Sequence, residues 1–69
     1  MSGYGFYVEG KFEKMIWAAN DTAALMQAMS IAMSGCVTQW KLGMVEACAY
    51  YDEPCIIREV ASVNDDTVM

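Results

Sequence analysis

The segment TAALMQAMSIAMSG, from Thr22 to Gly35, contains no charged residue and three methionines. Asn20 and Asp21 precede it, and their side-chain oxygens can accept hydrogen bonds from the free amides of a first helical turn. Gly35 suits the left-handed conformation that ends many helices. The pattern therefore predicts a helix over Asp21–Ser34.

Apolar side chains surround most of this predicted helix when they are placed at ~100° per residue. A helix on the surface of one domain needs an apolar stripe only a little over ~100° wide. The three methionines fit two interpretations, because methionine fills irregular gaps in a core and also forms adaptable contact surfaces. We expect Met26, Ile31 and Met33 to form a self-association surface and the chain to be a possible homodimer.

Before the helix, the stretch YGFYVEGKFEKMIW (residues 4–17) contains two runs of residues that favour strands. Gly10 and Lys11 between them suit a two-residue type II′ turn, which would place Phe6 opposite Met15. The expected core face of this hairpin carries Tyr4, Phe6, Val8, Met15 and Trp17. The opposite face carries Tyr7, Glu9, Phe12, Lys14 and Ile16.

After the helix, MVEACAYYDEPCIIREVAS predicts two further strands, Met44–Tyr51 and Cys55–Ala61. The residues Asp52–Pro54 between them are good turn formers. A helix over Trp40–Tyr51 is the alternative, which Gly43 in its middle weakens.

These segments predict a small single domain of the α+β class, with the order ββαββ and an antiparallel sheet packed on one helix. The domain is expected over residues 1–63, and residues 64–69 are expected to form a flexible acidic C-terminal tail. A chain of 69 residues is marginally stable unless a disulfide, a metal or a partner assists it. The expected core consists of Tyr4, Phe6, Val8, Met15, Trp17, Leu25, Met29, Ala32, Ile56 and Val60.

The net charge and the distribution of basic residues argue against binding to nucleic acid. The net charge is −5 and the four basic residues are scattered, whereas nucleic-acid binding requires clustered Lys and Arg. Polar residues interrupt the uncharged central stretch, so we expect no membrane association. No secretory signal is visible at the N-terminus, and we expect a cytoplasmic location, which is the host cytoplasm if a phage encodes the chain.

The three cysteines, Cys36, Cys48 and Cys55, are an odd number and form no closed disulfide framework. We expect them to be reduced and buried, and the predicted hairpin disfavours a bond between Cys48 and Cys55. The chain has no histidine, and its three separated thiols are too few for the four ligands of a zinc site. We expect neither a metal nor a cofactor.

Catalytic patterns are also missing from the sequence. A nucleophile needs a nearby base, and no histidine is available to pair with a cysteine. The adjacent carboxylates Asp52-Glu53 and Asp65-Asp66 fall in a predicted turn and in the predicted tail, whereas acid–base catalysis needs a pocket that shifts pKa values. We therefore expect a non-enzymatic protein.

Binding to another protein is the function that remains. Exposed aromatic residues are the usual anchors of interfaces, and acidic residues either steer a protein onto a basic target or only keep it soluble. The candidate partner-binding residues are Tyr7, Glu9, Phe12, Trp40, Asp52 and Glu53.

The order hairpin, helix, hairpin in a short acidic chain is similar to that of many small phage and mobile-element proteins. Such proteins bind a host enzyme or a defence complex. We expect an anti-CRISPR-like inhibitor that occludes a functional surface of its target, such as one that binds nucleic acid. The alternatives are a self-assembling structural or virion subunit, and a small enzyme formed at a dimer interface with Cys48 or Cys55.

Overall fold

A four-stranded antiparallel sheet carries one helix in the computed structural model, which describes residues 1–46 and 54–64. The elements along the chain are β1 (Ser2–Val8), β2 (Lys11–Ala18), α1 (Asp21–Ser34), β3 (Gln39–Glu46) and β4 (Cys55–Asn64). The strands lie in the order β2-β1-β3-β4. The predicted α+β class and the order ββαββ are confirmed.

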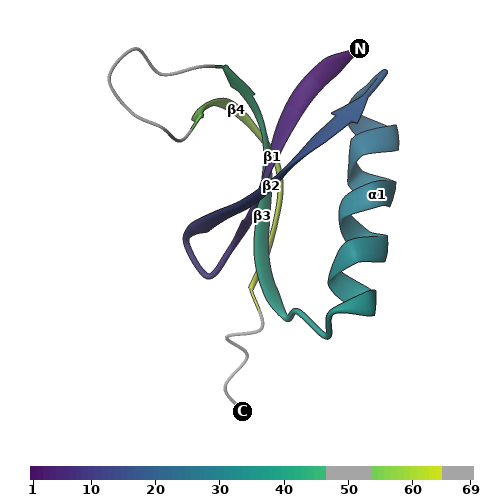
Figure 1. The fold of residues 1–69 in the computed structure, drawn as a ribbon, viewed down its shortest axis with the longest axis vertical. Helices are drawn as coiled ribbons and strands as arrows, with labels where there is room; N and C mark the ends of the chain where they lie inside the picture. The colour runs from purple at the N-terminus through teal and green to yellow at the C-terminus, as the bar shows by residue number, and fades with distance from the viewer. Residues whose placement is uncertain (47–53, 65–69) are drawn as a thin grey trace.

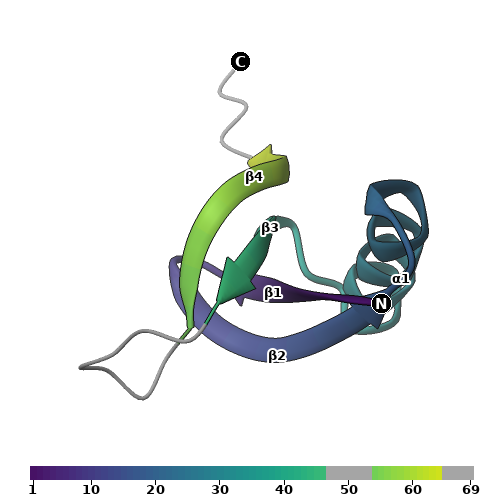
Figure 2. The ribbon, with the colours of Figure 1, turned by 90° about the horizontal axis from the view of Figure 1, so that it is seen from above.

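Helix α1 lies on one side of the sheet and contacts β2, β3 and β4 (Figures 1 and 2). Its bounds agree with the prediction. The Oδ1 atom of Asn20 accepts a hydrogen bond of 2.8 Å from the amide of Ala23, so Asn20 is the N-cap.

The end of α1 differs from the expectation. Gly35 has φ −95°, and the left-handed residue is Cys36, with φ 56°. The amide of Cys36 donates to the carbonyl of Met33, and that of Val37 donates to the carbonyl of Ala32 at 2.8 Å. This pair of bonds is a Schellman motif, in which Cys36 occupies the position usually taken by glycine.

The first hairpin turns one residue earlier than the sequence suggested. Val8 pairs with Lys11, and the turn residues Glu9 and Gly10 have φ 50° and 84°. Positive φ at both central positions is the mark of a type I′ turn. The predicted turn at Gly10-Lys11 is therefore wrong.

A bulge in β2 then sets the pairing of the rest of the hairpin. The register shifts beyond the Tyr7–Phe12 pair, so Tyr4 lies opposite Ile16. A change of one residue moves a strand's side chains to the other face of the sheet. Ile16 is therefore buried in the core, while Trp17 points away from it and is 57% exposed.

The second hairpin begins earlier than predicted, since β3 starts at Gln39 and not at Met44. The alternative helix over residues 40–51 is wrong for residues 40–46, and residues 47–51 lie outside the described part. The pairing of β3 with β4 shifts register twice, and β4 arches strongly (Figure 2). Strand β4 continues to Asn64, the first residue of the predicted tail.

The core lies between α1 and the face of the sheet toward it. Tyr4, Phe6 and Leu42 are its largest fully buried side chains, and the rings of Phe6 and Trp40 lie 5.5 Å apart. Three of the predicted core residues are buried, namely Tyr4, Phe6 and Ala32, and Val8, Leu25 and Val60 are partly buried. Met15 is half-buried on the opposite face of the sheet, and Trp17, Met29 and Ile56 are exposed, so the prediction of these four as core residues is wrong.

Candidate protein-binding surfaces

Helix α1 directs its smallest apolar residues toward the sheet. Its buried residues are Ala24, Ala28 and Ala32, which follow one another at intervals of four. Small side chains leave room for the large residues of the sheet in a close-packed interior. The larger apolar side chains of the helix consequently have less contact with the domain.

The surface that we call the methionine face consists of Met26, Met29 and Met33, which are 66%, 47% and 77% exposed. Two of the three residues expected to mediate self-association, Met26 and Met33, therefore lie together on the surface. The third, Ile31, is half-buried and packs against the core. The large side chains of α1 that point outward are thus methionines, which adapt to varied partners.

Two hollows flank the pair Met29 and Met33, which line both of them. The first, which we call the helix groove, is an open depression of about 600 Å³, and Leu25, Val37, Ala61 and Val63 are among its other lining residues. The second, of about 580 Å³, is shared with Met26, Ser30 and Ser34. The methionine pair therefore forms a ridge between two depressions.

On the opposite face of the sheet, strand β1 has two glycines, Gly3 and Gly5, against which large side chains pack. A Cβ atom added to Gly3 would lie 2.8 Å from Cε of Met15 and 3.0 Å from a ring atom of Trp17. A Cβ atom added to Gly5 would lie 2.7 Å from the ring of Tyr7. Large side chains thus lie directly on the backbone of β1, which holds their rings in place.

The surface that we call the aromatic face consists of Tyr7, Phe12 and Trp17. The rings of Tyr7 and Phe12 meet edge to face at 5.5 Å, and the Tyr7 hydroxyl donates a hydrogen bond of 3.0 Å to the carbonyl of Pro54. The structure brings together Tyr7 and Phe12, both named from the sequence. Trp17 was missed, because the bulge beyond the Tyr7–Phe12 pair, and not the turn, moves it to this face.

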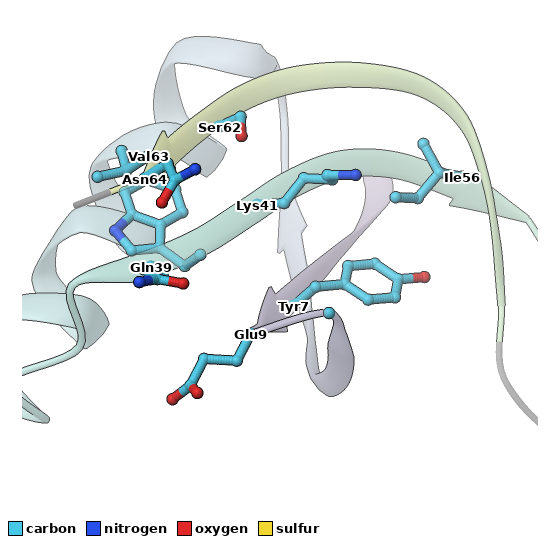
Figure 3. A pocket seen from close by; sticks show the side chains of 10 residues that line it. Tyr7, Glu9, Gln39, Lys41, Ile56, Ser62, Val63 and Asn64 are labelled. Atoms are coloured by element: carbon cyan, nitrogen blue, oxygen red, sulfur yellow. The ribbon is translucent and has the colours of Figure 1, made fainter. Parts of the chain in front are cut away.

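A third groove, of about 590 Å³, opens where β4 arches over β3 (Figure 3). Tyr7, Lys41 and Ile56 reach it from three different strands, and Glu9 lies on its rim. The Nζ atom of Lys41 is 3.9 Å from a carboxylate oxygen of Glu59. The lining contains both polar and apolar side chains, and the cation Lys41 already faces the carboxylate of Glu59.

The other residues named from the sequence do not join these surfaces as expected. Trp40 is only 6% exposed and packs against Phe6, so the expectation of an exposed anchor at Trp40 is wrong. Asp52 and Glu53 lie outside the described residues. Glu9 is exposed at the tip of the first hairpin.

A polar cluster joins β4 to the start of α1. The Nη1 and Nη2 atoms of Arg58 lie 2.6 and 2.9 Å from the carboxylate oxygens of Asp21, and the Tyr4 hydroxyl donates to the same carboxylate at 2.8 Å. The hydrogen bonds from Arg58 and then from Tyr4 lower the pKa of Asp21 to about 2. The bond to Asp21 in turn raises the pKa of Tyr4 above its ordinary value.

The cysteines are not the buried thiols that we expected. Cys36 is a free, exposed thiol, and Cys55 is exposed and takes part in a disulfide bond. The prediction of burial is therefore wrong for both, and the prediction of a reduced thiol is confirmed for Cys36 and wrong for Cys55. The expectation about a bond between Cys48 and Cys55 involves Cys48, which lies outside the described residues.

Within residues 1–46 and 54–64, no three His, Cys, Asp or Glu side chains converge as a metal site would require. The helix in this part is too short to span a bilayer. Comparison with protein-family models, curated proteins and solved structures finds no match to the chain.

Proposed function

We propose that this protein is a non-enzymatic binding module that docks onto a partner protein through the aromatic face. The observation that carries the proposal is the position of Trp17, which is 57% exposed although its ring lies on the backbone of Gly3. Tryptophan and tyrosine dominate the binding energy of interfaces. A ring already held in place loses little freedom on binding, which favours affinity.

The partner in this proposal is a host or defence complex that the protein inhibits by covering a functional surface, in the manner of an anti-CRISPR protein. The net charge of −5 favours association with a basic surface, such as one that handles nucleic acid. The exposed acids Glu9 and Glu13 lie on the hairpin that carries the aromatic face. They would raise the association rate more than the final affinity.

The alternatives from the sequence are supported unequally. A self-assembling subunit has support in the methionine face, which offers a second apolar surface. A cysteine enzyme that uses Cys55 has less support, because the sulfur of Cys55 is in a disulfide bond and is no free nucleophile.

Affinity isolation from a host lysate with three variants tests the proposal. Wild type and Ile57→Ala should retain the same complex, and Trp17→Ala should lose it. Ile57 is the matched control, because it is an apolar residue 53% exposed on another strand. Thermal unfolding of each variant must first show that the fold is kept.

The retained complex is then purified and its dissociation constant is measured at several salt concentrations. Trp17→Ala should weaken binding at least 30-fold, as expected for a hot spot. Wild-type protein should inhibit the complex at near-stoichiometric ratio, and added salt should slow association. Equal binding by wild type and Trp17→Ala would overturn the proposal.

A further inference from the structure

The methionine face remains open after the aromatic face is assigned to a partner. We propose that a second copy of this chain covers it, in a homodimer built on an antiparallel α1–α1 pair. This inference is independent of the proposed function, because it concerns the opposite side of the molecule.

The shape of the methionine face suits a helix. Met29 and Met33 form a ridge at i and i+4, and a hollow lies on each side of it. Helices pack by placing the ridge of one in the groove of the other. A two-fold symmetric contact requires one surface to carry both features, as this surface does. The ridge of each copy can thus enter the hollow of the other.

The charge distribution favours a second copy over a basic partner here. No charged residue occurs from Thr22 to Trp40, so a basic surface would find no counter-charge on the face. The nearest acid, Asp21, is paired with Arg58. The other described acids, Glu9, Glu13, Glu46 and Glu59, lie on the strands or in the hairpin turn. As far as residues 1–46 and 54–64 are concerned, two copies can therefore meet here without bringing carboxylates together, although each carries a net charge of −5.

A stable dimer must bury more surface than the outer side of α1 can supply. A stable interface buries about 800 Å² on each side, which is about one sixth of the 4824 Å² surface of this chain. A helix of 14 residues is only about 21 Å long, so its outer stripe alone is too narrow. The helix groove adds Val37, Ala61 and the exposed Val63, which extend the apolar surface onto β4. The interface therefore consists of the methionine face and the helix groove together.

The antiparallel orientation follows from the helix ends. A parallel pair would align the two helix dipoles side by side and bring both Asp21 carboxylates to one end, whereas an antiparallel pair opposes the dipoles. The residue numbers then define the contacts. Met29 lies near the two-fold axis, and Met26 of one copy faces Met33 of the other.

Sedimentation over a range of micromolar concentrations tests the dimer. Wild-type protein should have twice the mass of the chain, and Met29→Lys and Met29→Glu should each be monomeric, because like charges meet at the axis. Mixing these two variants should restore a dimer. Ile57→Lys is the matched control and should remain dimeric. A monomeric wild type, or a mixture that stays monomeric, would overturn the proposal.

Cross-linking under mild oxidation tests the orientation. Thr22 lies seven residues before Met29 and so on the same side of α1, and in an antiparallel pair it approaches the partner's Cys36. Thr22→Cys should therefore form a cross-linked dimer that Cys36→Ser abolishes. Rapid cross-linking of wild type through Cys36 alone would indicate a parallel pair, and large particles would indicate a structural subunit; either result contradicts the proposal. Trp17→Ala should leave the dimer intact, so this proposal and the proposed function fail separately.

Discussion

The Schellman motif at the end of α1 gives opposite expectations for two neighbouring substitutions. Cys36 has φ 56°, where a side chain raises the energy by ~1–2 kcal/mol relative to glycine. Part of this gain, ~0.5–1 kcal/mol, is lost on substitution by glycine, because an unfolded chain with glycine has more conformational entropy. Cys36→Gly should therefore stabilise the protein by about 0.5–1 kcal/mol, and the melting temperature should rise by several degrees.

Gly35 supplies the matched control for this prediction. Its φ of −95° is open to any residue, and an added Cβ atom would lie 3.5 Å from Val37 and from the carbonyl of Ile31, which is ordinary contact. Gly35→Ala should be neutral, or stabilise by ~0.4–1 kcal/mol through the unfolded state. Cys36→Ser should show no gain, because it removes the thiol and keeps the strained backbone.

Thermal and urea unfolding, followed by far-ultraviolet circular dichroism at one protein concentration, measure these changes. A constant concentration matters because association shifts the apparent stability. If Gly35→Ala were destabilising and Cys36→Gly gave no gain, Gly35 would be the left-handed residue. That outcome would refute the reasoning about the helix end.

Two further predictions concern stability. The pKa of Asp21 is about 2 in the folded protein and 3.8 for a free side chain, so the unfolded state binds more protons between these values; the stabilisation is complete above pH 3.8 and is lost as the pH falls toward 2. Asp21→Asn should remove this part of the pH dependence in acid titrations of unfolding, and an unchanged profile would contradict the assignment. Gly5→Ala should destabilise the fold by ~1–3 kcal/mol and alter the near-ultraviolet dichroism of Tyr7, because the new Cβ atom would lie 2.7 Å from the ring of Tyr7 and 2.9 Å from Val45. A neutral Gly5→Ala would show that these rings do not rest on the backbone.

Local signals in the sequence were sufficient for the elements and their order. The side chain of Asn20 caps the helix by accepting a hydrogen bond from the amide of Ala23, only three residues away. The strands of both hairpins are rich in residues that favour extended structure. Such signals act over a few residues, so they can be read without the fold. The start of β3 at Gln39 was missed, because Trp40 and Leu42 in a short apolar run are compatible with either a helix or a strand.

The candidate site was only partly predictable. Tyr7 and Phe12 were named and do lie together, but Trp17 was assigned to the core and Trp40 to the surface. Both errors concern which side of a strand faces the helix. For Trp17 the cause is the bulge beyond the Tyr7–Phe12 pair, which moves the register by one residue, whereas the different turn moves it by two and leaves the faces unchanged.

The sequence by itself determined that the chain forms a helix between two hairpins and that this helix is apolar on nearly every side. Only the tertiary structure decided which side faces the sheet. A helix with little polar surface has no preferred orientation from periodicity alone, so packing volume selects it. Tyr4, Phe6 and Leu42 fill the face of the sheet, which leaves room on α1 for alanines and directs Met26, Met29 and Met33 outward.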